Sequence, residues 1–304
     1  MVDPLAQVVT LLQPSTPFSK ISSGAGRWKV ERSEPGRPFY CAVLEGSCRL
    51  VANGIEPMVL EAGDFVLIPA VHDFAMSSLL PAGPEHVVRM PTLLPNGESR
   101  LGLPDEPADV RSLIGYCVFD SPDAALLVSL LPRVVHVRGQ RRLATLVQLV
   151  GEEARAKLPA REIILTRLLE VLFIEALRST SGSTASPGLL RGLADDRVAA
   201  ALRRMHDVPS HAWTVAQLAK EASLSRSAFF ERFNRALGSA PMEYLLAWRM
   251  ALAKDLLRRG EFDTAEVARH VGYGSTSSFS VAFARYVGLP PARYSREQVA
   301  LRAV

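Results

Sequence analysis

LAKEASLSRSAFFERFNRALGSAPMEYLLAWRM, residues 218–250, and VARHVGYGSTSSFSVAFARYVGLPPARY, residues 267–294, are two versions of one pattern. In each version a serine, Ser225 or Ser275, is followed four and eight residues later by phenylalanine. A glycine, a proline and a tyrosine then stand 13, 16 and 19 residues beyond the same serine. Agreement at this many positions indicates a true internal repeat.

Each copy predicts two short helices joined by a tight turn, because residues suited to helix starts stand at the right places. The capping-box pairs are Thr214 with Gln217 and Asp263 with Glu266, and the single caps are Ser225 and Ser275. Two short helices joined by about three residues form a helix-turn-helix. The sequence therefore predicts one such motif at 214–235 and a second at 263–285.

The segment between the copies predicts one connecting helix. Residues 242–259 have apolar side chains at three- and four-residue steps, and Pro241 precedes them where a helix start tolerates proline. At about 1.5 Å per residue this helix is roughly 25 Å long. The two motifs would then be held at a separation close to the roughly 34 Å of one DNA turn.

Aromatic side chains of this region could instead be stacking platforms for single-stranded nucleic acid. Their helical spacing favours core packing. The residues concerned are Trp213, Trp248, Phe229, Phe233, Phe279 and Phe283.

The stretch 213–296, which contains both motifs and the connecting helix, resembles the DNA-binding domain of AraC/XylS-type transcription regulators. The resemblance implies a sequence-specific regulator that binds double-stranded DNA, with RNA polymerase as a further candidate partner. Glu231 and Val281 stand where family members often have an arginine, and Leu289-Pro290 replaces part of the usual closing motif. Strong guanine contacts are therefore not expected at those two positions.

The DNA contacts expected from a docked helix-turn-helix lie at the start and along the outer face of each second helix. Those near base edges are Arg226, Ser227, Thr276 and Ser277, and Glu231 and Ser280 are further expected DNA-binding positions. Those expected to hold phosphates, or to form surface salt bridges, are Arg232, Arg235 and Arg285. The alternative for the helix-start residues is that they are merely solvated.

The first half of the chain predicts a small β-sandwich or barrel, because short strands alternate with turn signals such as Asn53-Gly54. The expected strands are 27–32, 39–45, 48–52, 58–60, 65–69 and a returning strand within 114–119. Six prolines predict an irregular loop over 81–107. PFYCAVLEGSCRLVANG, residues 38–54, and LEAGDFVLIP, residues 60–69, are similar to the cupin barrel that many such regulators use as an effector domain.

The predicted fold is α+β in two domains: a cupin-like barrel with two helices over 1–178, a linker over 179–188, and an all-α domain over 189–304. The two helices come from apolar periodicity between residues 140 and 178. They could simply pack on the barrel. In similar regulators this region pairs two subunits, so a homodimer through 140–178 is expected.

The expected ligand-binding residues of the barrel are Phe39, Cys41, His72 and Phe74, with a small molecule or a partner protein as effector. The rival is a cupin enzyme fused to a DNA-targeting domain. Such enzymes need a His-x-His pair on an early strand, and residues 27–52 contain no histidine. A zinc site using Cys41, Cys48 and His86 is the remaining metal alternative. We therefore expect no enzyme activity, no metal and no cofactor.

Charge and composition indicate the kind of partner and the cellular compartment. The formal net charge is +4 over 304 residues, and residues 188–304 carry 17 basic and 11 acidic side chains, which favours a polyanion partner for that half. A non-specific architectural DNA protein would be far more basic and would lack the barrel. The sequence shows no signal peptide or membrane span, and its three cysteines suggest reduced thiols. We expect a cytoplasmic protein without membrane contact.

Overall fold

The computed structural model describes residues 3–12, 14–88, 90–119, 124–129, 131, 133–156, 158–179 and 188–302. The chain forms two compact units. The barrel unit comprises Pro14–Asp120 and Pro132–Ser181, and the helical unit comprises Met1–Gln13, Ser121–Leu131 and Gly182–Val304.

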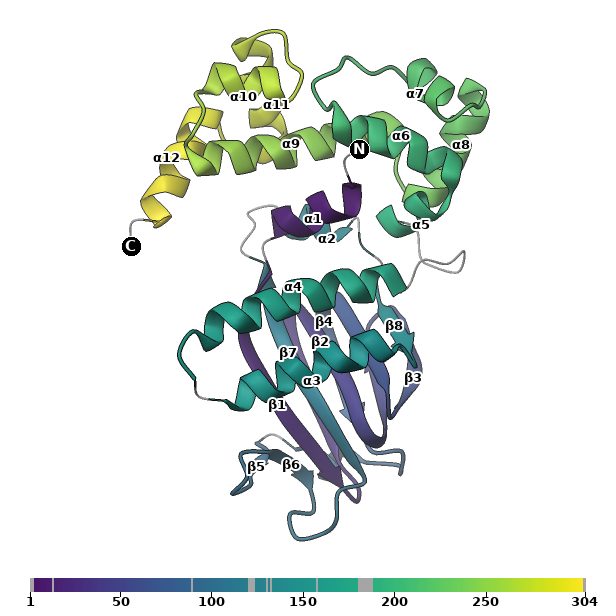
Figure 1. The fold of residues 1–304 in the computed structure, drawn as a ribbon, viewed down its shortest axis with the longest axis vertical. Coiled ribbons are helices and arrows are strands. Elements are labelled where there is room, and N and C mark those ends of the chain that lie inside the picture. The colour runs from purple at the N-terminus through teal and green to yellow at the C-terminus, as the bar shows by residue number, and fades with distance from the viewer. Residues whose placement is uncertain are drawn as a thin grey trace. The chain divides into compact units, whose positions relative to one another are not determined.

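The barrel unit is built on one curved sheet (Figure 1). Its strands are β1 (Pro14–Ala25), β2 (Lys29–Ala52), β3 (Ile55–Glu61), β4 (Asp64–Ser77), β5 (Thr92–Leu93), β6 (Ser99–Gly102), β7 (Val110–Phe119) and β8 (Val135–Arg138). Their order is β5-β6-β1-β7-β2-β4-β8, with β3 paired to β2. The β1–β6 pair is parallel and the other pairs in this order are antiparallel. This arrangement brings side chains of β2, β3, β4, β6 and β7 together around one apolar interior.

The predicted strands are present, but their boundaries were wrong in two ways. Three of them are one strand, β2, whose pairing with β4 shifts register between Ser33 and Arg37 and again between Ala42 and Arg49. β1 was missed because its polar, serine-rich sequence lacks apolar alternation. The predicted Asn53-Gly54 hairpin is confirmed: Ala52 pairs with Ile55, and Gly54 has the positive φ of +73° that such turns need.

The predicted irregular loop over 81–107 is only partly irregular. It includes the 3-10 helix η1 (Pro84–His86) as well as β5 and β6. The short β6 is held by parallel pairing to β1, a long-range contact that local proline content does not reveal.

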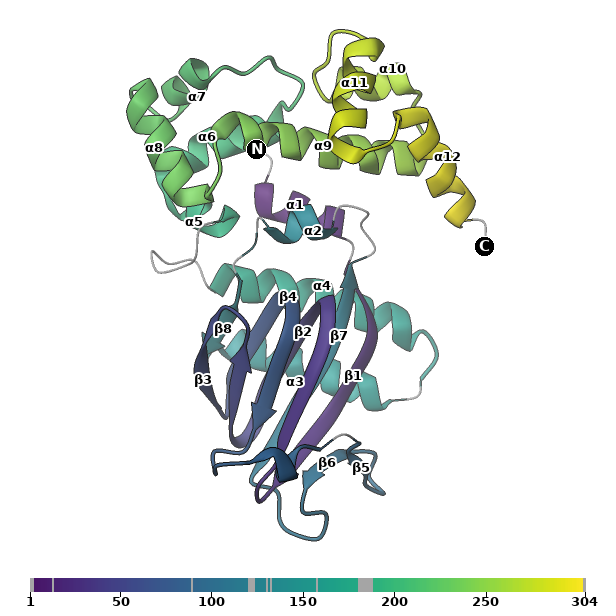
Figure 2. The ribbon, with the colours of Figure 1, turned by 180° about the vertical axis from the view of Figure 1, so that it is seen from behind.

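Two helices, α3 (Arg141–Arg155) and α4 (Arg161–Ser179), lie side by side across one face of the sheet, as Figures 1 and 2 show from opposite sides. Their sheet-facing side chains are buried: Leu143, Val147 and Val150 of α3, and Leu165, Leu169, Leu172, Phe173, Ala176 and Leu177 of α4. The apolar residues of α4 lie on two faces, because Leu172 is buried while Ile164 is 42% exposed.

The helical unit contains both repeated motifs. Its helices are α1 (Pro4–Leu12), α2 (Ala124–Ser129), α5 (Leu189–Ala194), α6 (Asp196–Asp207), α7 (Val215–Glu221), α8 (Arg226–Leu237), α9 (Pro241–Arg259), α10 (Thr264–His270), α11 (Thr276–Val287) and α12 (Pro291–Arg302). The predicted connecting helix is α9, which runs from the α7–α8 motif to the α10–α11 motif (Figure 1).

Two segments expected in the first domain pack in the helical unit instead. α1 contacts α6 and α9, and α2 contacts α9. The apolar residues of α1, including Val8 and Leu12, are buried there. The predicted linker lies mostly outside the described residues, which resume at Gly188.

Candidate DNA interface and barrel cavity

Side-chain caps fix where each motif begins. Thr214 N–H donates to Gln217 Oε1 over 2.9 Å, and Gln217 N–H donates to Thr214 Oγ1 over 3.2 Å. Asp263 and Glu266 form the same reciprocal pair at 3.0 and 2.7 Å. Both predicted capping boxes are confirmed, so α7 and α10 start at equivalent points.

The second helix of each motif starts in the same way. Ser225 Oγ accepts from Ala228 N–H at 3.3 Å, and Ser275 Oγ accepts from Ser278 N–H at 3.1 Å. Each helix then ends at a glycine with positive φ, +78° at Gly238 and +85° at Gly288.

The core of each motif is a pair of phenylalanines and the tyrosine that follows. Ring centroids are 5.5 Å apart in both pairs, Phe229 with Phe233 and Phe279 with Phe283. Tyr244 and Tyr294 then pack edge-on against the second ring of each pair, at 5.8 and 5.5 Å. These four phenylalanines are fully buried, and Trp248 and Trp213 are only 1% and 8% exposed, so the rings pack in the core and offer no stacking platform for single strands.

The outer faces of α8 and α11 carry the predicted DNA contacts. The exposed ones are Arg226, Ser227, Glu231, Arg232 and Arg235 on α8, and Thr276, Ser277 and Arg285 on α11. Ser280 is half-buried, and Val281 is 67% exposed. Each helix thus gathers its predicted contacts on one accessible side.

Arg232 differs from the other arginines of this face. Its Nε donates to Asp195 Oδ2 over 2.6 Å, and the Asp195 carboxylate also caps α6. Burial opposes ionisation of Asp195, but hydrogen bonds led by that of Arg232 outweigh it and hold the pKa of the carboxyl below its usual value. Of the two roles expected for Arg232, a phosphate contact or a surface salt bridge, the structure contains the salt bridge.

α9 ties the motifs together as a buried element. Trp248 and Leu257 are almost fully buried, and Arg258 and Arg259 both pair with Asp255, at 2.7 and 2.8 Å. Arg249 donates to the backbone carbonyls of Pro209 and His211, each over 2.8 Å, which fastens the loop before α7 to this helix.

His206 is a residue that sequence reasoning missed. Its imidazole is buried between Gln7 Oε1, 2.9 Å from Nδ1, and the Tyr244 hydroxyl, 2.7 Å from Nε2, and it stacks on Trp248. Burial lowers the pKa of His206 to about 3, so it is neutral at physiological pH. The position of His206 on the apolar face of α6 could have predicted from the sequence that it is buried.

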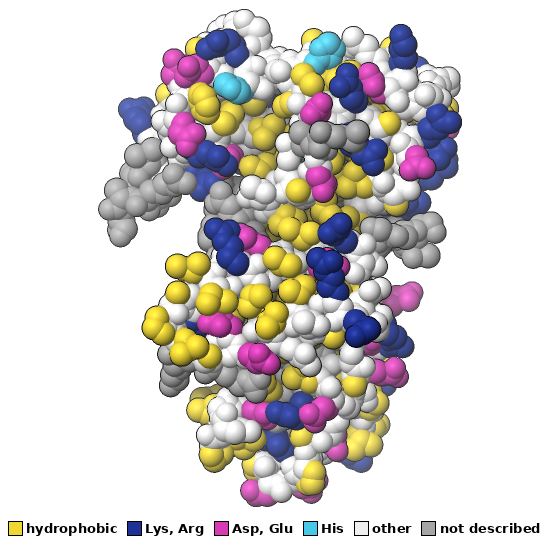
Figure 3. Space-filling view, in the orientation of Figure 1, with side chains coloured by type: hydrophobic (Ala, Val, Ile, Leu, Met, Phe, Trp, Pro, Cys, Tyr) yellow, Lys and Arg dark blue, Asp and Glu magenta, His cyan; other side chains and the backbone are white. Residues whose placement is uncertain are grey.

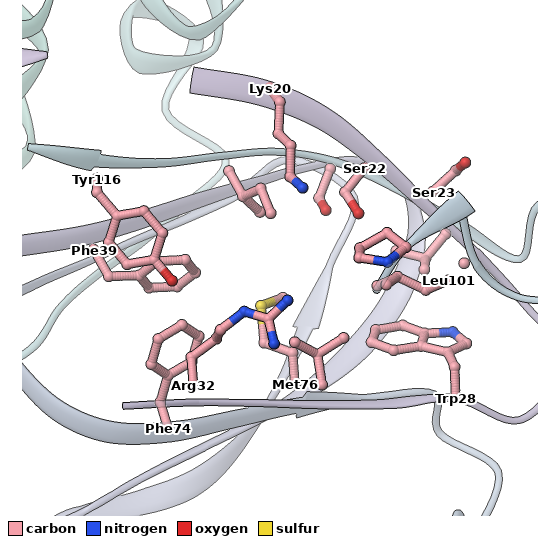
Figure 4. Close-up of a pocket in the computed structure, with 16 residues that line it drawn as sticks. Lys20, Ser22, Ser23, Trp28, Arg32, Phe39, Phe74, Met76, Leu101 and Tyr116 are labelled. Carbon is pink, nitrogen blue, oxygen red and sulfur yellow. The ribbon is translucent and has the colours of Figure 1, made fainter. Parts of the chain in front are cut away.

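The barrel unit encloses a cavity of about 200 Å³ (Figure 4). Of the predicted ligand residues, Phe39 and Phe74 line it, whereas Cys41 is buried in the core and does not. The side chain of His72 lies outside the described part. Sequence reasoning missed the lining residues Lys20, Trp28, Arg32, Met76 and Tyr116.

A pattern that could have found some of them is present. Trp28, directly before β2, and Val30 and Arg32 of β2 stand two residues apart and all line the cavity. Residues two apart on a strand share a face.

Nothing in the described part gathers three His, Cys, Asp or Glu side chains around a common point where a metal could bind. The proposed zinc ligands are separately engaged: His86 Nδ1 accepts from Gly83 N–H at 3.2 Å, and Cys41 and Cys48 are free, buried thiols. Burial raises the pKa of Cys48 to about 12 and that of Cys41 well above its usual value. Both sulfurs are therefore protonated core groups.

Comparisons with known proteins match this architecture over most of the chain. The Cupin family model matches residues 3–182, and the model of a helix-turn-helix domain matches residues 218–297. An AraC-like transcription regulator of Streptomyces lividans is 35% identical over 302 residues, which covers 97% of this chain and 98% of that one. This chain belongs to the AraC-like transcription regulators.

A second AraC-like regulator, from Streptomyces antibioticus, is 36% identical over 302 residues and covers 97% of this chain and 99% of its own. The DNA-binding domain of AdpA, solved in complex with a target DNA, is 29% identical over 36% of this chain and 97% of its own, with a TM-score of 0.34. The predicted family, the two-part α+β fold and the DNA-binding function of this AraC-like regulator are confirmed. In the described residues, no helix is both long and apolar enough to cross a membrane.

Proposed function

We propose that one subunit of this regulator inserts α8 and α11 into successive major grooves of duplex DNA. The observation that carries this proposal is that two equivalent helices present exposed polar faces and are joined through one buried helix, α9. Its 19 residues span about 28 Å at about 1.5 Å per residue. Each subunit would then protect two short boxes about 10 base pairs apart centre to centre.

Within this arrangement Arg226, Ser227, Thr276 and Ser277 contact base edges, because docked motifs present the first turn of the second helix to the groove. Arg235 and Arg285 lie one turn or more further along their helices and contact phosphates. Arg232 stays paired with Asp195 and holds no phosphate in this arrangement.

The test is selection of binding sites from random duplexes by the full-length protein. Two boxes at constant spacing are expected. A single box, or two boxes at variable spacing, would mean that the second motif serves structure and not DNA recognition. Arg235→Ala and Arg285→Ala should weaken all sequences alike and flatten the salt dependence by about one unit of slope, as loss of a phosphate contact does.

The barrel unit acts as the regulatory domain in this proposal, with its cavity as the effector site. The largely apolar lining of the cavity, which includes Phe39 and Phe74, supports that role. Transcription assays on the selected sites test whether RNA polymerase is a further partner.

We propose a cytoplasmic regulator without catalysis. Elemental analysis of purified protein should find no stoichiometric iron, manganese, nickel or zinc, and a metal lost in His72→Ala would contradict this.

We further propose that the regulator is a homodimer through α3 and α4. Ile164, Leu168 and Val171 fall on one outward stripe of α4, and Ile164 and Val171 are 42% and 44% exposed. Leu149 of α3 is also exposed, and Figure 3 displays apolar side chains gathered over this face of the barrel unit. Exposed apolar patches of this kind are typical of protein interfaces.

Sedimentation of Ile164→Glu/Val171→Glu against the unmodified chain tests the dimer. The double variant should be a soluble monomer. Leu172→Glu is not a valid test, because Leu172 is buried against the sheet and its replacement would unfold the domain. Thr166→Glu, a polar change on the same helix, is the matched control and should remain dimeric. A wild-type monomer, or a dimeric double variant, would disprove this interface.

A further inference from the structure

The loop that precedes α7 meets the turn of the second motif at the middle of α9. This loop, 208–213, joins α6 to α7, and Figures 1 and 2 show it reaching from α6 toward the α10–α11 motif. Arg249 is the ninth of the 19 residues of α9. Its Nε and Nη2 donate to the backbone carbonyls of Pro209 and His211, each over 2.8 Å. One half-buried guanidinium therefore holds two carbonyls of the loop.

The turn of the second motif closes on the same point. A Cβ on Gly272 would lie 2.6 Å from the carbonyl oxygen of Ser210 and 2.8 Å from Arg249 Nη2, so the backbone of the turn lies directly against both. Burial raises the pKa of the next residue, Tyr273, and the positive charge of Arg249 opposes that rise, so the phenol lies near the guanidinium. The loop, α9 and the turn share one junction, which connects the two motifs in addition to α9 itself.

Each side of this junction is fixed to the motif it belongs to. On the first side, Trp213 Nε1 donates to the Val208 carbonyl over 3.0 Å, and the next residue, Thr214, caps α7. On the second side, the ring of Tyr273 packs edge-on against Phe279 in the core of the motif, with centroids 5.6 Å apart. A change at the junction would therefore move one motif relative to the other.

We propose that Arg249 is a positioning residue that fixes the distance and rotation between α8 and α11, and so sets the spacing of the two DNA boxes. This inference rests on the proposed insertion of both helices into successive major grooves. A second connection at the middle of α9 restricts bending and twisting between the motifs. Two linked binding modules bind most tightly when their connection matches the distance between their sites, and a looser connection lowers that affinity and tolerates other distances.

Binding to duplexes of altered spacing tests the proposal. One inserted base pair moves a box by roughly 3.4 Å and rotates it by roughly 36°, because about 10 base pairs form a turn of about 34 Å. The unmodified full-length protein should lose about tenfold or more in affinity when one base pair is inserted between the selected boxes. Arg249→Met keeps the apolar stem without the two hydrogen bonds. It should bind the selected spacing more weakly and lose only about threefold or less on the same insertion.

Two variants separate positioning from charge. Arg235→Met removes a positive charge expected to contact a phosphate, so it should weaken binding at every spacing alike and retain the spacing preference. Arg249→Lys keeps the charge but lacks the planar fork that serves two carbonyls at once, so its spacing preference should be intermediate. A spacing preference lost equally in Arg235→Met would attribute the effect to net charge and overturn the proposal.

Duplexes in which one box is scrambled show whether each motif of Arg249→Met still binds. Its affinity for either single box should stay within about threefold of the unmodified protein, because the contacts of each motif are retained. Loss of single-box binding would mean that the junction holds a motif together, and an unchanged spacing preference would mean that α9 alone sets the spacing. Either result overturns the proposal and leaves recognition of two boxes standing. An unmodified protein that tolerates every spacing would refute the proposed function and the positioning role with it.

Discussion

The two helix-turn-helix copies agree where they are buried and differ where they are exposed. Capping boxes, serine caps, paired phenylalanines, left-handed glycines and the following tyrosine recur with nearly identical geometry. The exposed side of α8 is charged, with Arg226, Glu231 and Arg235, whereas that of α11 is mostly hydroxyl and apolar, with Thr276 and Val281.

The turns differ as well. Ser223, at a φ of +52°, and Gly272, at +82°, occupy equivalent places, and the second turn contains an additional residue, Gly274. A Cβ on Gly272 would lie 2.6 Å from the Ser210 carbonyl oxygen, so only glycine fits there. The shared core specifies the same fold in both copies, and we expect the divergent surfaces to give each copy a different target. The first copy should therefore depend more on charge than the second.

The largest effects should come from the shared core and be equal in the two copies. Phe233 and Phe283 are both fully buried, so Phe233→Ala and Phe283→Ala should each cost about 3 to 5 kcal/mol of unfolding free energy. Denaturant titration followed by circular dichroism measures the loss. Phe230→Ala, at a 43% exposed position of α8, is the control and should change stability by no more than about 0.5 kcal/mol. A much smaller cost for Phe283→Ala would break the equivalence of the copies.

His206, on α6, contacts Tyr244 of the first copy and should give that half of the helical unit a pH dependence. Its folded pKa of about 3 lies below the unfolded value near 6.5, so the unfolded state takes up a proton first as the pH falls. The stability present above pH 6.5 is then lost toward pH 3, and between pH 7.5 and 4.5 this amounts to about 2 to 3 kcal/mol.

The measurement is the unfolding free energy of the full chain across that pH range. His206→Gln should reduce the slope, whatever its effect on absolute stability. His211→Gln, at an exposed histidine of the same unit, is the control and should keep the wild-type slope. An unchanged slope in His206→Gln would mean that folding does not lower the pKa of His206.

The local features of the helices could be predicted from the sequence. The features that depend on contacts between distant segments could not. The caps, the phenylalanine pairs and α9 follow from local spacing, which directly encodes helix starts and faces. The packing of α1 and α2 in the helical unit, the fused strand β2 and the cavity cations depend on tertiary pairing. Lys20 was missed because β1 has no apolar alternation, whereas Arg32 lay on a recognised strand whose inward face was not followed through.

The exposed surfaces give the next effect, which should differ between the copies. Arg226→Ala should relax base preference in the box that α8 contacts by about 1 to 3 kcal/mol, if the guanidinium makes a bidentate contact. Thr276→Ala should relax the other box by less, because one hydroxyl makes a weaker contact. Binding of single-base variants of the selected site measures both. If either change relaxed base preference in both boxes, the two helices would not act independently.

The smallest effects should come from Glu231 and Val281, the equivalent positions that lack arginine. Both face outward, and Val281 can offer a base only apolar contact, which suits a thymine methyl and little else. Base changes opposite these two side chains should therefore cost less than about 1 kcal/mol of binding free energy, below the roughly 1 to 3 kcal/mol of a mismatch elsewhere in a site.

Glu231→Gln removes a negative charge beside the phosphates and should tighten binding to all sequences slightly, more at low salt than at high salt. Glu56→Gln, an exposed carboxylate of the barrel unit, makes the same change in net charge and should have no such effect. A sharp base preference opposite Glu231 that disappears in Glu231→Gln would instead mean that the carboxylate accepts from a cytosine amino group, and the charged face of α8 would then specify sequence at both Arg226 and Glu231.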